Sequence, residues 1–216
     1  IGNFVVDGAE GATHGGPPIL QDDLGLPTLH ALARTVRYLE QAGAKDDVSI
    51  IASGGLVTPG HFLKALALGA DAVYIGTIAL LATLHTQMLK AAPVEPAVQV
   101  ALYTGRYSED FDVDQGAQSL ANFLRSCVRE MELAVYALGK TAFRQLERSD
   151  LCSVDPEIAR MCGIDYAAFP PDRQPFGPDG ARAAGNGVAA RRPGAGAGAD
   201  GVPVGSAAGP DQDHHR

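Results

Sequence analysis

The sequence predicts an α/β fold with a parallel sheet, built from repeated strand–loop–helix units. Three short, mostly apolar runs, near 4–6, 48–52 and 72–75, are each followed by a glycine-containing loop and then by a helical pattern. Strands that are covered on both faces have this apolar character, and their alternation with helices indicates parallel pairing. Periodicity alone does not choose between a closed barrel and an open doubly wound sheet.

A helical pattern follows each apolar run. The first covers about 24–42, ends near Gly43 and has apolar residues at spacings of three and four, namely Leu29, Leu32, Ala33, Val36 and Leu39. The second begins after Thr58, a good N-cap, with Pro59 at its first position, and closes at Gly69. The third lies near 78–90. These helices are the crossovers that a parallel sheet requires.

The pattern changes after Pro96. A loop near 104–113 leads into a long predicted helix, about 114–138, which Gly139 ends. Two short helices are expected at 141–147 and 155–161, and Asp155 and Pro156 form the start of the second.

The chain divides by composition near Pro170. Residues 1–170 carry the α/β pattern, whereas 171–216 are rich in Gly, Ala and Pro and nearly lack aromatic residues. Such a segment buries too little apolar surface to offset its ordering entropy. We therefore expect a disordered tail, to which we assign no function.

Composition excludes several classes of function. A net charge of −8 argues against a nucleic-acid or anionic-membrane surface. The sequence has no uninterrupted apolar run long enough for a membrane span and no signal-peptide pattern at its start. Cys127, Cys152 and Cys162 lack metal-ligand spacing, so we expect no metal site, and reduced thiols that pack as small apolar side chains in a cytoplasmic protein.

Two glycine turns each open a helix after a predicted strand. They are Ser53-Gly54-Gly55 and Gly76-Thr77. Glycine lets backbone N–H groups approach an anion closely, and the helix dipole favours negative charge at the same place. Both turns therefore suit a phosphate group, although tight packing of strand against helix would also explain the glycines.

The loop after the first strand is acidic. Asp7-Gly8-Ala9-Glu10-Gly11 places two carboxylates at the C-terminal end of a strand, with Thr13 and His14 following. An acid there can orient a substrate ammonium group or bind hydroxyl groups, or it can simply cap the following turn. We expect His14 to be solvated.

Together these motifs resemble the FMN-binding synthase domain of the glutamate synthase family. The resemblance covers about 1–168 and rests on DGAEGATHGGPP followed by IIASGGLVTPGHFLKALALGADAVYIGTIAL. It implies the C-terminal part of a (β/α)8 TIM barrel, with about three βα units, additional C-terminal helices and the tail. It also implies bound FMN and formation of glutamate from 2-oxoglutarate and ammonia through 2-iminoglutarate.

The resemblance assigns roles residue by residue. The FMN phosphate would be held by Ser53, Gly54, Gly55, Gly76 and Thr77. The substrate would be bound at the mouth by Asp7, Gly8, Gly11 and Thr13. Glu10 is the candidate for a catalytic polar role there.

Two features depart from the family pattern. Many members carry cysteines after the last strand that ligate an iron–sulfur cluster, but LLATLHTQMLKAAPVEPAVQ contains none, so we predict no such cluster in this chain. A complete barrel also has eight strands, and only three are visible. We therefore expect a missing N-terminal part of the barrel and an electron-donor protein as partners, and expect the chain by itself to be inactive and either unstable or oligomeric.

Three alternatives remain open at this point. Another FMN barrel, such as a 2-hydroxy-acid oxidase or an IMP dehydrogenase-like protein, shares the glycine turns. A non-catalytic half-barrel that binds flavin or phosphate is a different class. A truncated product without function is the third.

Overall fold

A computed structural model describes residues 2–11, 17, 19–87, 98–177 and 181. The predicted tail beyond 181 and the site residue Thr13 lie outside them. Segment 171–177 contains a 3-10 turn, Pro171–Arg173, and the Gln174 side chain accepts a hydrogen bond from the Tyr166 N–H at 2.7 Å. Ordered contacts thus continue past 170.

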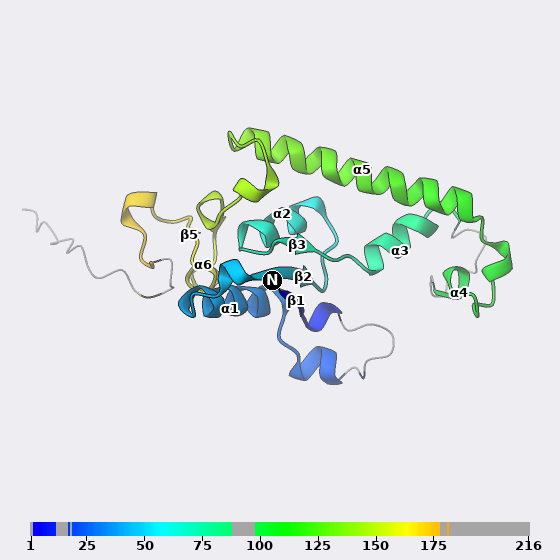
Figure 1. Cartoon of the computed structure of the whole chain (residues 1–216), viewed down its shortest axis with the longest axis horizontal. Coiled ribbons are helices and arrows are strands. Elements are labelled where there is room, and N and C mark those ends of the chain that lie inside the picture. The colour runs from blue at the N-terminus through cyan, green and yellow to red at the C-terminus, as the bar shows by residue number, and fades with distance from the viewer. Residues whose placement is uncertain (1, 12–16, 18, 88–97, 178–180, 182–216) are drawn as a thin grey trace, which may run out of the picture. The chain divides into compact units, whose positions relative to one another are not determined.

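The core of the fold is a three-stranded parallel sheet. β1 (Gly2–Asp7), β2 (Val48–Ser53) and β3 (Ala72–Val73) lie in the order β1-β2-β3 (Figure 1). The register pairs Gly2 with Val48 and Asp7 with Ser53, so the C-terminal ends of β1 and β2 are level. The parallel sheet with its crossover helices confirms the predicted α/β class, and it is consistent with an arc of a (β/α)8 barrel.

Helices α1 (Thr28–Gln41), α2 (Pro59–Ala67) and α3 (Thr77–Leu84) follow the three strands in turn. α1 begins four residues later than predicted, because Pro27 occupies its N-cap and a separate π-helical turn, Leu20–Leu24, precedes it. The Thr58 side chain caps α2 as expected, by accepting from the His61 N–H at 3.3 Å. The predicted end of the third helix, 88–90, lies outside the described residues.

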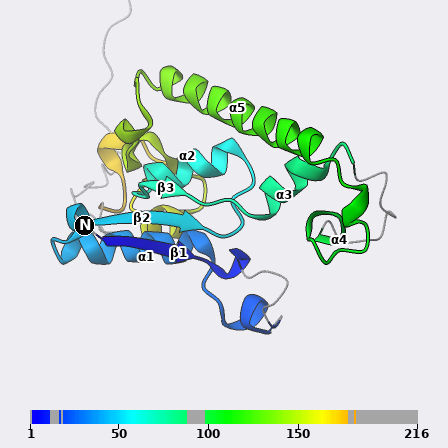
Figure 2. The same cartoon turned by 45° about the vertical axis from the view of Figure 1, so that its right-hand side comes forward.

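The main core lies between the sheet and α1. Val6 of β1 and Ile50 and Ala52 of β2 pack against Leu32 and Val36 of α1, and Figure 2 shows the two strands side by side along this helix. Gly69 after α2 has φ +108°, and a Cβ on it would lie only 2.8 Å from Val36 Cγ1. That close approach brings α2 onto the same core.

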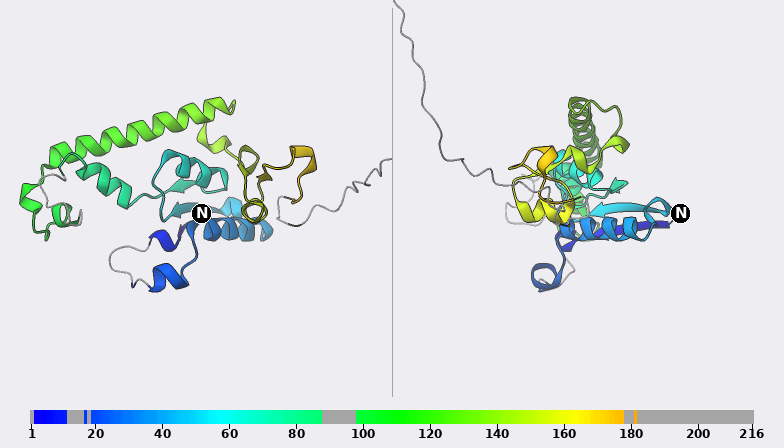
Figure 3. Two further views of the ribbon diagram at one scale, coloured as in Figure 1. Left: turned by 180° about the vertical axis from the view of Figure 1, so that it is seen from behind. Right: turned by 90° about the vertical axis from the view of Figure 1, so that its left-hand side faces the viewer.

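The long helix α5 (Val113–Ala137) covers α2 and α3 from outside (Figures 1 and 3). Cys127 and Met131 of α5 pack on Phe62 of α2. The Asp112 side chain caps α5 by accepting from the Gln115 N–H at 3.0 Å. A short helix, α4 (Val98–Ala101), precedes it.

The segment after α5 is held to α1. α6 (Pro156–Cys162) confirms the predicted last helix, and Asp155 caps it. A two-stranded parallel sheet flanks it, formed by β4 (Cys152–Ser153) and β5 (Asp165–Tyr166). The Arg37 guanidinium donates to the carbonyl groups of Arg160 and Met161, and the Arg148 guanidinium contacts both Glu40 carboxylate oxygens at 2.9 and 3.0 Å.

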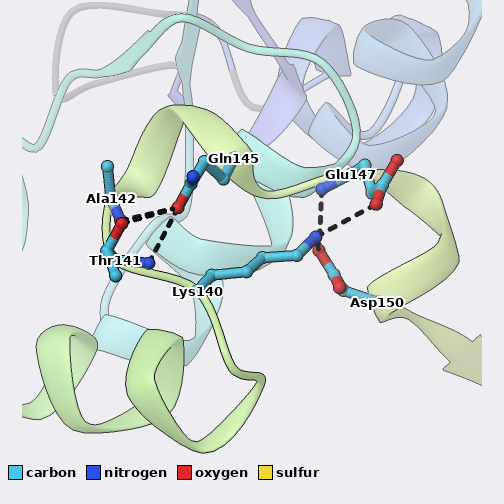
Figure 4. A network of polar contacts seen from close by, with 6 residues as sticks. All are labelled: Lys140, Thr141, Ala142, Gln145, Glu147 and Asp150. Atoms are coloured by element: carbon cyan, nitrogen blue, oxygen red, sulfur yellow. Dashed lines mark hydrogen bonds and ion pairs between the residues drawn. The ribbon is translucent and has the colours of Figure 1, made fainter.

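The helix predicted at 141–147 is wrong. Two separate 3-10 turns, Phe143–Gln145 and Arg148–Asp150, stand there instead. Figure 4 shows the reason: the Gln145 side-chain carbonyl accepts from the N–H groups of Thr141 and Ala142. Lys140 reaches across to Glu147 and Asp150. The Glu147 N–H donates to the Asp150 carboxylate in the same way, so side-chain acceptors close two short turns in succession.

The three cysteines, which were predicted to be reduced thiols, differ in burial. Cys127 and Cys162 are buried in the core, where burial raises the pKa of both thiols, while Cys152 is exposed.

No helix among the described residues is long and apolar enough to cross a membrane.

Candidate functional site

A cavity of about 420 Å³ opens where the three parallel strands end. Eight of the residues predicted for the site line it, namely Asp7, Glu10, Gly11, Ser53, Gly54, Gly55, Gly76 and Thr77. Gly8 is buried behind the loop, so its backbone supports the wall instead of lining it. The structure thus brings the three separate sequence motifs to one place, although the role of each residue stays a prediction.

Packing accounts for the glycines of the Ser53–Gly55 turn. Gly54 has φ +102° and Gly55 has φ +66°, which L side chains rarely adopt. A Cβ on Gly54 would lie 2.5 Å from the Thr28 hydroxyl oxygen, and one on Gly55 would lie 2.8 Å from Glu10 Cβ. Both glycines of this turn therefore lie against the acidic loop and the start of α1, with or without a ligand.

Packing does not account for Gly76. A Cβ there would meet no heavy atom within 4 Å, and the residue lines the cavity. Gly76 is the N-cap of α3 and no side chain caps this helix. The first intrahelical bond runs from the Leu80 N–H to the Gly76 carbonyl at 3.1 Å, so the N–H groups of 77–79 precede the helical ladder and remain available to an anion.

The acidic loop is folded tightly onto β2. Residues Ala9–Gly11 form a 3-10 turn, the Gly8 N–H donates to the Ser53 carbonyl at 3.1 Å, and the Gly11 N–H donates to the Gly8 carbonyl at 2.8 Å. A Cβ on Gly11 would collide with the Asp7 carboxylate. Asp7 therefore lies directly against the loop backbone at the cavity wall.

Glu10 serves as a remote cap for α1. Its Oε2 accepts from the Thr28 N–H at 2.7 Å and from the Thr28 hydroxyl at 2.8 Å, and α1 has no other side-chain cap. Burial opposes ionisation, but these hydrogen bonds and the nearby His30 outweigh it, so the pKa of Glu10 lies below its ordinary value. This cap belongs to a helix 18 residues later and not to the following turn, which was the capping role considered from the sequence, and the catalytic role of Glu10 stays a prediction.

Sequence reasoning missed two polar residues at the site. Thr28 stands at the first position of α1, and its partner lies 18 residues earlier, which no local pattern indicates. Tyr74 follows β3 and is 55% exposed at the cavity wall. Alternation along the strand would have found Tyr74, because its neighbours Val73 and Ile75 pack on the helices.

Within the described ranges, no group of three His, Cys, Asp or Glu side chains is arranged to hold a metal ion. The polar groups that line the cavity include two carboxylates and the hydroxyl groups of Ser53, Thr77 and Tyr74.

Comparison with known families gives one match by family model. The model described as "Conserved region in glutamate synthase" matches residues 2–141. This stretch contains all three motifs of the cavity.

Curated proteins similar to the chain carry related names. The archaeal glutamate synthase [NADPH] of Methanocaldococcus jannaschii is 32% identical over 142 residues, which cover 66% of this chain and 28% of that protein. The glutamate synthase large subunit-like protein of Rhizobium meliloti is 29% identical over 179 residues, covering 76% and 40%. An archaeal-type glutamate synthase [NADPH] of Thermotoga maritima is 34% identical over 147 residues, covering 66% and 28%.

The chain therefore spans 28–40% of the length of these relatives. Among solved structures, a mutant flavocytochrome b2 with pyruvate bound aligns with a TM-score of 0.39 and 24% identity, over 68% of this chain and 28% of that one.

Proposed function

This chain belongs to the glutamate synthase family, and on that premise we propose that its cavity is the phosphate-binding end of an FMN site. The observation that carries the proposal is the glycine at the open N-terminus of α3. Gly76 has free space where a Cβ would stand, and the first-turn N–H groups of α3 lack a side-chain cap. A phosphate group fits such a helix end without a cationic side chain.

The charges of the cavity are compatible with this proposal. Glu10 is a carboxylate in the same cavity, but its Oε2 is held by two donors at the start of α1. The dipole of α1 and these hydrogen bonds offset its charge. The phosphate would lie at the Gly76–Thr77 turn, with Ser53, Gly54 and Gly55 as the facing wall.

We further propose that the whole protein to which this chain corresponds forms glutamate from 2-oxoglutarate and ammonia. Bound FMN would supply the hydride that reduces the imine carbon of 2-iminoglutarate. The residues of this chain would anchor the cofactor and orient polar groups of the substrate, with Asp7 and Glu10 facing the mouth. The remaining strands and an electron-donor protein would come from outside this chain, and the free thiols fit a reducing, cytoplasmic compartment.

The test is an FMN titration of the chain followed by flavin fluorescence, with Gly76→Val as the variant. We expect saturable binding by the wild-type chain and at least about tenfold weaker binding by the variant, because the added side chain fills the space beside the α3 N-terminus. Gly76 is a cleaner position than Gly55, where φ +66° and the contact with Glu10 would strain the turn itself.

Gly2→Val is the matched control. A Cβ on Gly2 also meets nothing within 4 Å, but Gly2 starts β1, at the other end of the strand from the cavity. Equal affinity of the Gly76→Val and wild-type chains would place the phosphate elsewhere. Glutamate formation by the complete protein then separates a glutamate synthase from other flavin-binding barrels.

A further inference from the structure

Thr28 contacts two of the loops that wall the cavity, the acidic loop and the Ser53–Gly55 turn. Its N–H and hydroxyl both contact Glu10 Oε2, at 2.7 and 2.8 Å. The same hydroxyl oxygen lies 2.9 Å from the Gly54 carbonyl oxygen and 3.2 Å from that of Ser53. Only 6% of the residue is exposed. One side chain thus joins the acidic loop, the Ser53–Gly55 turn and the first residue of α1.

The backbone around Thr28 leaves no room for a looser arrangement. A Cβ on Gly8 would collide with the Thr28 backbone and hydroxyl, and one on Gly54 would lie 2.5 Å from Thr28 Oγ1. Gly54 also sits against the N–H groups of Gly8 and Gly11, each 3.0 Å from its ideal Cβ position. A shift of Thr28 would therefore move the acidic loop and the Ser53–Gly55 turn together.

The Thr28 hydroxyl has one proton and three acceptors within reach. While Glu10 is ionised, its carboxylate is the strongest of these acceptors and takes the proton. Once Glu10 is protonated, its own O–H can donate to Thr28, and the threonine proton turns to the Gly54 carbonyl. The hydroxyl is therefore placed to pass the charge state of Glu10 to the turn.

We propose that Thr28 is the positioning residue of the cavity, which fixes the Glu10 carboxylate and couples the acidic loop to the Ser53–Gly55 turn. Its consequence for cofactor affinity rests on the proposed FMN site, whereas the coupling itself does not. Two other titratable groups in the described part of the chain bear on Glu10: His30 on α1, whose charge acts on it, and Asp7, which lines the same cavity. Variants confined to Thr28 leave both unchanged.

The experiment compares Thr28→Val, which removes the hydroxyl at nearly constant shape, with Thr28→Ser, which keeps it. Thr83→Val is the matched control, because the Thr83 hydroxyl donates to the Ala79 carbonyl within α3 and has no other hydrogen bond to the described residues. Carboxyl carbon NMR of the full chain follows the titration of Glu10, and the Gly54 amide resonance reports the turn. We expect Thr28→Val to raise the pKa of Glu10 and to abolish the response of Gly54, and Thr28→Ser and Thr83→Val to behave as wild type.

An unchanged Glu10 titration in Thr28→Val would overturn the proposal. If that variant fails to fold, the wild-type chain can still test the proposal. A Gly54 resonance that does not shift as Glu10 titrates would show that the acidic loop and the Ser53–Gly55 turn are not coupled. FMN affinity is the second readout, and we expect a loss on the order of tenfold in Thr28→Val that Thr28→Ser restores. Absence of FMN binding in every chain would reject the proposed function while the NMR result stands by itself.

Discussion

At the level of single residues, the Glu10 carboxylate belongs both to the cavity and to the N-terminal cap of α1. It lines the cavity and also accepts the first N–H of α1, where Pro27 offers no side-chain cap. A carboxylate at a helix N-terminus is stabilising through hydrogen bonding and the helix dipole. Any loss of activity in a Glu10 variant must therefore be separated from a loss of stability.

We expect Glu10→Gln to lower the free energy of unfolding by about 1 kcal/mol at neutral pH, because the amide keeps the shape but not the charge. The folded-state pKa of Glu10 lies below its unfolded value, so its contribution is complete above the ordinary pKa and disappears as the pH falls through the folded value. Urea unfolding across this acidic range measures the difference.

Glu130→Gln, at an exposed position of α5, is the control for removing a charge alone. A deficit of Glu10→Gln that stays equal at neutral and acidic pH would show that the charge on Glu10 is not the cause.

At the scale of elements, one buried amide fixes the start of α5. The Gln87 side chain is 1% exposed, accepts from the Asp112 N–H at 2.8 Å and donates to the Asp112 carbonyl at 2.9 Å. Asp112 in turn caps α5. Helices α3 and α5 also approach each other closely at Gly116 of α5, where a Cβ would lie 3.1 Å from the Thr83 methyl carbon of α3.

Gln87→Leu should therefore lower the free energy of unfolding by about 1–2 kcal/mol, because it removes both hydrogen bonds to the Asp112 backbone and leaves the Asp112 carbonyl only its bond from the Gly116 N–H. Chemical denaturation followed by circular dichroism gives the value. Gln118→Leu, whose amide bonds only to Asn122 on the exposed face of α5, provides the comparison. Equal destabilisation by the two substitutions would contradict the role assigned to Gln87.

At the scale of the whole molecule, the sheet has an unpaired edge in the described part of the chain. β1 pairs with β2 alone, and its apolar residues Phe4 and Val5 are 51% and 44% exposed. Exposed edges of this kind recruit further strands, from the same protein or from other copies. In the intact protein we propose that the missing N-terminal part of the barrel covers this edge.

We predict that the chain by itself associates in a concentration-dependent way and that Val5→Lys weakens the association, because a charge on an edge strand opposes pairing. Light scattering after size-exclusion chromatography measures it over a range of concentrations. Val154→Lys changes an equally apolar residue, 87% exposed and remote from this edge, and should have no effect. A monodisperse wild-type monomer would refute the prediction.

Local sequence signals predicted most elements, because they depend on neighbouring residues. The strands, α2 with its Thr58 cap, α5 and α6 all appear near their predicted places. The prediction failed at 141–147, where the Gln145 and Asp150 side chains accept backbone N–H groups and close two separate turns. Side-chain capture of backbone donors competes with helix formation, and its outcome depends on the packed surroundings.

Local patterns in the sequence were enough to predict the parallel α/β class, the three motifs and their common location, because parallel strands bring their C-terminal ends to one edge. The contacts that each motif makes could be seen only after the elements were packed together. It showed that Gly54 and Gly55 are required by contacts with Thr28 and Glu10, whereas Gly76 faces open space. The reason is physical: a contact across 18 or more residues depends on how the elements pack, and no local pattern encodes that distance.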